Sequence, residues 1–81
     1  MDRFSIVILE RTAELAREVM HPDQYPRVAD CVSVIRQYVE SPNSEYDKAL
    51  RYAVITLFGI ARQKCHFLIA ARLSPIARQL S

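Results

Sequence analysis

The sequence predicts an all-α fold, a small bundle of three to four helices that forms a single helical domain over residues 1–81. Apolar residues recur at spacings of three and four along most of the chain, which is the period of one helix face. Glycine occurs once, and proline, which ends or begins helices, is confined to four positions. These prolines mark the expected joints between helices: Pro22, Pro26, Pro42 and Pro75.

Residues 4–20 are predicted to form the first helix. The residues predicted to share one helical face are Phe4, Ile8, Thr12, Leu15 and Val19. The stretch FSIVIL at residues 4–9 also carries apolar residues off this face, so a short strand is the alternative there. Helix is the better interpretation, because the chain offers no second strand whose backbone groups could pair with this one.

Residues 25–40 carry the clearest amphipathic pattern. The predicted core face comprises Val28, Cys31, Val32, Ile35 and Val39. The far side is polar and comprises Asp30, Ser33, Gln37 and Glu40. We therefore expect Cys31 to pack in the core as a small apolar side chain.

The third helix is predicted to begin in the stretch SPNSEYD, with Ser44 as N-cap and Asp47 in the capping-box position. It would run from Glu45 towards Leu73, a length of about 43 Å, whereas a domain of this size is only about 30 Å across. Either Gly59 interrupts this helix, or the helix projects and a second protomer covers it. Its predicted core face comprises Tyr46, Leu50, Ala53, Val54, Leu57, Ile60, Ala61, Cys65, Leu68 and Ala71.

A last short helix is expected near the end of the sequence. Ser74 would be its N-cap and Pro75 would lie in its first turn, where the missing N–H of proline costs nothing.

Charge is distributed unevenly along the chain. Residues 1–47 hold nine acids against five arginines, and Glu10, Glu14 and Glu18 form an acidic ridge at four-residue spacing. Residues 48–81 hold six cations and no acid. Either the two halves attract each other, or the basic half meets an anionic partner. The candidate partner-binding residues are the cations and one histidine of this half: Lys48, Arg51, Arg62, His66, Arg72 and Arg78.

The sequence gives no sign of metal, cofactor or catalytic chemistry. The adjacent Cys65 and His66 point about 100° apart on a helix, so they are poorly placed to share an ion or to form a nucleophile–base pair. There is no C-x-x-C spacing, and a hairpin of the second and third helices would hold Cys31 and Cys65 too far apart for a disulfide. The sequence therefore predicts that the protein is not an enzyme.

These observations favour a small non-catalytic protein-interaction module, that is, an adaptor, a chaperone-like escort or an inhibitor. The apolar fraction of 51% is high for so short a chain, which favours a protein partner and a homo-oligomer formed through the long third helix. The alternative is a regulator that binds nucleic acid through its basic half. No apolar run is long enough to span a membrane, and the unpaired cysteines suggest a cytoplasmic location.

Overall fold

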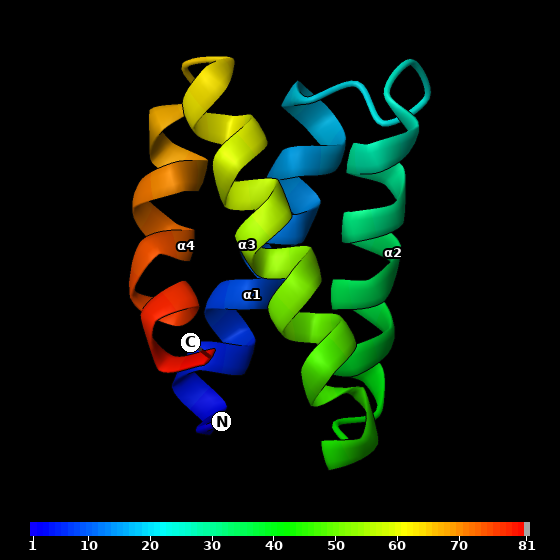
Figure 1. Cartoon of the computed structure of the whole chain (residues 1–81), viewed down its shortest axis with the longest axis vertical. Helices are drawn as coiled ribbons and strands as arrows, with labels where there is room; N and C mark the ends of the chain where they lie inside the picture. Colours follow the sequence, from blue (N-terminus) through cyan, green and yellow to red (C-terminus); the bar gives the residue numbers. More distant parts are fainter. Residues whose placement is uncertain (81) are drawn as a thin grey trace.

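The structure is a computed structural model that describes residues 1–80. They form α1 (Arg3–Val19), α2 (Pro26–Glu40), the 3₁₀ turn η1 (Ser44–Tyr46), α3 (Asp47–Gln63) and α4 (Phe67–Leu80). Each helix packs against the next and α4 packs against α1, which closes an antiparallel up-down-up-down bundle of 29 × 22 × 19 Å (Figure 1). The prediction of an all-α fold is confirmed. Residues 4–9 are helical, as expected.

The bundle places α1 and α3 at opposite corners, with α2 and α4 at the other two. In Figure 1, α3 lies in front, α1 lies behind it, and both ends of the chain lie at the bottom. The interior is filled by one apolar cluster drawn from all four helices. Its largest fully buried aliphatic side chains are Leu9, Ile35, Leu50, Leu57, Ile69, Leu73 and Ile76, each of which stabilises the fold by about 1.5–3 kcal/mol relative to exposure.

Helix α2 follows its predicted pattern closely. Val28, Cys31, Val32 and Ile35 are buried, and the four residues assigned to the polar side are exposed. Val39 is only half-buried, while Tyr38 next to it is buried. The regular 3–4 spacing of β-branched residues therefore identified the correct face, with a small error at the C-terminal turn.

The predicted core face of α1 was wrong in part: Thr12 is buried and Ile8 and Leu15 pack half-buried against the core, but Phe4 and Val19 are exposed. The face that the helix buries most fully is centred on Leu9, Ala13 and Ala16, and Met20 is buried just after the helix ends, whereas Phe4 is 72% exposed. Small alanine side chains let neighbouring helices approach closely, so the face with the smaller residues packs better than the face with the larger ones. Thr12 lies on both faces, and it is buried because its hydroxyl donates a hydrogen bond to the Ile8 carbonyl at 2.6 Å.

The start of α1 is fixed by Asp2. Its carboxylate accepts a hydrogen bond from the backbone N–H of Ser5 at 3.0 Å, which satisfies one of the free donors of the first turn. The Ser5 side chain and then the Ser5 N–H hold the pKa of the Asp2 carboxyl below its ordinary value. This cap agrees with the observed beginning of the helix at Arg3.

The third helix neither breaks at Gly59 nor projects from the bundle, so both alternatives for a long third helix were wrong. It passes through Gly59 and ends at Gln63, and Cys65 adopts a left-handed conformation with φ of 61°. The Cys65 N–H donates to the Arg62 carbonyl and the His66 N–H donates to the Ala61 carbonyl, which together form a Schellman motif. The chain then turns back as α4 along α3.

This turn changes which later residues are buried. Cys65, Leu68 and Ala71 were assigned to the core face of a continuous helix, but all three are exposed. The face that packs inward on α4 comprises Ile69, Ala70, Leu73 and Ile76. Tyr46, at the other end of the predicted face, is also exposed, while the positions from Leu50 to Ala61 are buried or half-buried as expected.

Two predicted helix starts were also wrong. Asn43, and not Ser44, provides the cap before α3, since its Oδ1 accepts the Glu45 N–H at 3.0 Å. Ser74 and Pro75 lie inside α4 and do not open a new helix. The helix continues through Pro75 because Leu73 and Ile76 on either side are fully buried and hold the backbone in place.

Gly59 is the only glycine in the chain, and it lies in the middle of α3. A glycine here costs about 0.5–1 kcal/mol relative to alanine, because it loses more conformational freedom on folding. A Cβ atom added at this position would have nothing within 4 Å, so packing inside the described chain does not require glycine.

Candidate protein-binding surfaces

The predicted cationic residues of α3 lie towards its two ends. Lys48 and Arg51 lie near its start, at the end of the bundle that holds the chain termini. Arg62 lies in the last turn, and His66 lies in the connection to α4. Eleven residues of helix separate Arg51 from Arg62, a distance of about 16 Å along the axis. These four residues therefore form two separate groups.

The two arginines of α4 are placed differently again. The Ser5 hydroxyl of α1 donates a hydrogen bond of 3.4 Å to the Gln79 side-chain oxygen, which identifies the side of α4 that faces α1. Arg72 precedes Gln79 by seven residues and so lies on that same side. Arg78 lies in the last turn, about 100° from Gln79 around the helix. The six predicted residues do not gather into one patch.

Two cations near the α3–α4 turn rest on aromatic rings. The Arg62 guanidinium lies 5.6 Å from the centre of the Phe58 ring on its own helix. The Lys64 ammonium lies 3.9 Å from the centre of the Tyr25 ring, which precedes α2. The second contact ties the α3–α4 turn to the start of α2 by a cation–π interaction of about 0.5–1 kcal/mol.

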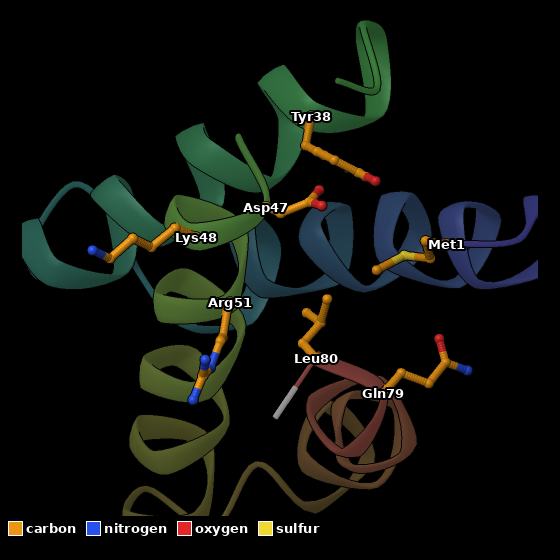
Figure 2. A pocket seen from close by; sticks show the side chains of 7 residues that line it. All are labelled: Met1, Tyr38, Asp47, Lys48, Arg51, Gln79 and Leu80. Carbon is orange, nitrogen blue, oxygen red and sulfur yellow. The ribbon is translucent and has the colours of Figure 1, made fainter. Parts of the chain in front are cut away.

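A hollow of about 620 Å³ opens at the end of the bundle near the chain termini. Its lining mixes one carboxylate, two cations and neutral groups from all parts of that end. Figure 2 shows Lys48 and Arg51 extending from α3 away from Met1 and Gln79. Since the charged groups do not converge on a common point, this hollow does not have the geometry of a catalytic or anion-binding site. Its described lining comprises Met1, Tyr38, Asp47, Lys48, Arg51, Gln79 and Leu80.

The acidic ridge of α1 lies away from the basic residues of α3. Glu10 and Glu14 share a small hollow with Arg36 of α2, and Glu14 and Glu18 share another with Arg17. The cations that the structure brings near the ridge thus come from the N-terminal half itself. Helix α3 lies across the bundle from α1, which separates Arg51 and Arg62 from the ridge.

Apolar side chains remain at the surface between α1 and α4. Of the residues first assigned to the core of α1, Phe4 and Val19 are exposed and Ile8 and Leu15 are half-buried. They lie next to the edge of α1 that carries Ser5, which faces α4. Leu68 lies eleven residues before Gln79, so in this antiparallel pair it lies level with the α1 turn that contains Leu15 and Val19. Leu68 is 57% exposed. We call this surface the α1–α4 apolar face: Phe4, Ile8, Leu15, Val19 and Leu68. Exposed Arg72 lies on the same side of α4, between Leu68 and Gln79, and interrupts the apolar side chains there.

A second exposed stripe runs along the outside of η1 and α3, at the corner of the bundle opposite α1. Its six positions follow one another at spacings of three and four residues, and all six are exposed. Tyr52 is 70% exposed and Ile55 is 42% exposed. We call this surface the α3 outer stripe: Glu45, Lys48, Tyr52, Ile55, Gly59 and Arg62.

An apolar groove of about 560 Å³ borders this stripe on the side of α2. Cys31 and Val34 of α2 line it opposite Ala49 and Ala53 of α3. Tyr52 lines the groove and also belongs to the α3 outer stripe, so the two features form a continuous surface. Sequence reasoning missed this surface because it examined the exposed side of the third helix for charge, although the 3–4 spacing of Tyr52, Ile55 and Gly59 was available.

The two cysteines differ in environment. Cys31 is buried, and this burial raises the pKa of its thiol, whereas Cys65 is exposed in the α3–α4 turn. Both thiols are free. Within residues 1–80, no three histidine, cysteine or acidic side chains come together as a group that could hold a metal ion.

Comparison of this chain with protein-family models, curated proteins and solved structures finds no match. None of the helices described between residues 1 and 80 is long and apolar enough to cross a membrane.

Proposed function

We propose that this protein is a small non-catalytic interaction module that binds another protein through its α1–α4 apolar face. The observation that supports this proposal is the exposure of Phe4 near the start of α1 and of Leu68 on the adjoining α4, level with Leu15, with Ile8 and Leu15 half-buried along the same side of α1. Contiguous apolar side chains at a surface are typical of protein-binding sites. An adaptor, an escort or an inhibitor would each use such a face, and the free Cys31 and Cys65 are in keeping with a cytoplasmic protein.

Binding of nucleic acid through the basic half has less support. Phosphate recognition needs cations that follow a continuous backbone, and the six predicted residues lie at two ends of α3 and on two sides of α4. A duplex titration would test this alternative. Nanomolar binding that weakens steeply with salt would replace the proposed function.

The proposal is tested by affinity capture from the native source with three forms of the protein. They are the wild type, the double variant Phe4→Glu with Leu68→Glu, and a control in which exposed Ser33 and Gln37 of α2 are both changed to Glu. All three should have similar melting temperatures, because none of the altered side chains is buried. A protein retained by the wild type and the control at about 0.5 M salt, but lost from the face variant, is the expected result. If no captured protein depends on this face, the proposal is wrong.

A further inference from the structure

We infer that the α3 outer stripe is an interface with a second copy of this chain, in which α3 pairs antiparallel with its own symmetry mate. The sequence-based expectation of self-association rested on the high apolar fraction and on a long third helix, but α3 ends at Gln63 and does not project. The present inference rests on the spacing, the charge order and the single glycine of the stripe.

The spacing of the stripe is that of a helix-pairing surface. The five positions within α3 are separated by four, three, four and three residues, which is the heptad spacing that keeps one side of a helix facing a partner helix. Glu45 lies in η1 three residues earlier and lines the same groove as Lys48 and Tyr52. The central apolar pair, Tyr52 and Ile55, is flanked by charged residues at both ends. The solvent-exposed side of an unpaired surface helix is typically polar, whereas this stripe has two apolar side chains at its centre.

The order of charge selects the relative direction of the two helices. Glu45 begins the stripe and Arg62 ends it. A parallel pair would set Glu45 against Glu45, Lys48 against Lys48 and Arg62 against Arg62 of the second copy. An antiparallel pair about a two-fold axis between residues 53 and 54 sets Glu45 beside Arg62 of the other copy, twice. Opposite charges therefore meet only in the antiparallel arrangement.

The same axis gives every other position of the stripe a suitable neighbour. Tyr52 lies opposite Ile55 of the second copy, and this apolar pair also occurs twice. Lys48 lies opposite Gly59, where the missing side chain leaves room for the aliphatic part of the lysine while its ammonium remains in water. This arrangement supplies a reason for a glycine that nothing inside the described chain requires.

The interface leaves the proposed protein-binding surface free. The stripe lies on the corner of the bundle opposite α1, so the α1–α4 apolar faces of the two copies point away from each other. The groove beside Tyr52 extends the apolar area of the interface towards Cys31 and Val34 of α2. Such a dimer would present two copies of the α1–α4 apolar face and gain affinity for a partner that is itself repeated.

The inference is tested with purified protein alone by sedimentation equilibrium from about 1 to about 100 µM. The wild type should reach twice the chain mass, and Ile55→Asp should remain at the mass of one chain. Glu45→Arg and Arg62→Glu should each raise the dissociation constant about tenfold, because two pairs change from attraction to repulsion. The double variant with both Glu45→Arg and Arg62→Glu should return the dissociation constant to the wild-type value. In that variant each reversed residue again lies beside a residue of opposite charge on the other copy.

This rescue cannot arise within one chain, because Glu45 in η1 and Arg62 in the last turn of α3 lie at opposite ends of that helix, about 25 Å apart. The control is Arg36→Glu, since Arg36 lies on α2 outside the stripe. This variant should leave the dissociation constant of the dimer unchanged. A wild type that remains monomeric over the whole range overturns the inference. So does a dimer that is indifferent to Ile55→Asp, or one that the double reversal fails to restore. None of these outcomes bears on capture through the α1–α4 apolar face, which is measured separately.

Discussion

The backbone N–H of His66 donates a hydrogen bond of 2.8 Å to the carbonyl of Ala61, five residues earlier in the chain. This bond closes α3 and forces the intervening Cys65 into the left-handed region, at φ of 61°. Most helices that end in this way place glycine at the left-handed position, because any Cβ costs about 1–2 kcal/mol there. The chain thus accepts local strain in order to bring α4 back against α3.

The substitution Cys65→Gly should therefore stabilise the protein by about 1 kcal/mol. Cys65→Val should destabilise it by a similar or larger amount, because a β-branched side chain tolerates positive φ poorly. Urea denaturation followed by circular dichroism measures both. Equal stability of the two variants would show that the residue does not adopt the left-handed conformation.

A second backbone prediction concerns Pro75 inside α4. Pro75 has no backbone N–H to donate to the carbonyl of Ala71, four residues earlier. Its ring also crowds that carbonyl. Since Pro75 and Ala71 are both exposed, replacing the proline removes no core contact. Pro75→Ala should raise the free energy of unfolding by about 1–3 kcal/mol. A loss of stability would instead mean that the ring makes a contact on which the helix depends.

These two positions show why the helix ends were harder to predict than the helices. Cys65 carries no sequence signal for a helix end, and Pro75 carries a strong signal where the helix continues. Tertiary packing decided the second case, since burial of Leu73 and Ile76 outweighs the cost of the proline. The spacing in α2 was sufficient because only one face of this helix reads as apolar, with polar residues on the opposite side.

The surfaces were predictable only in part. The cations were visible as a composition bias, but their positions depend on where α3 ends, which the sequence did not indicate. Phe4 and Val19 of the α1–α4 apolar face were mistaken for core, because two overlapping stripes on α1 both satisfy helical spacing. Only close packing against α2 and α4 distinguishes the stripe of Ala13 and Ala16 from that of Phe4 and Leu15.

The two thiols should react at very different rates. Cys65 is exposed and should be modified by a thiol reagent at the rate of an unfolded peptide, whereas buried Cys31 should react only when the protein opens. Cys65→Ser, the control, should abolish the fast phase and leave the slow one. Two fast thiols in the wild type would contradict the burial of Cys31.

The buried thiol also affects stability. Cys31→Ser should cost about 1–3 kcal/mol, because a hydroxyl replaces a packed thiol among apolar groups. Burial raises the pKa of Cys31 in the folded protein, so the unfolded chain ionises first and stability should fall as pH rises past about 9. In Cys31→Ala this part of the pH dependence should disappear. If the loss of stability above about pH 9 persists in Cys31→Ala, another ionisable group causes it.

The most informative test of the fold compares Leu9 with Phe4 on α1. Leu9 is fully buried, so Leu9→Ala should lower the free energy of unfolding by about 2–5 kcal/mol through lost burial and the cavity left behind. Phe4 is the larger residue, yet it is 72% exposed, and Phe4→Ala should change stability by no more than about 0.5 kcal/mol. Ranking by hydrophobic size alone would give the opposite order.

The same comparison bears on binding. If Phe4→Ala leaves stability intact, the phenylalanine is available at the surface and its loss should weaken capture of a protein partner. If Phe4→Ala instead costs as much as Leu9→Ala, α1 is rotated about its axis relative to the arrangement described above. The α1–α4 apolar face would then be part of the core, and the proposed function would lose the surface on which it depends.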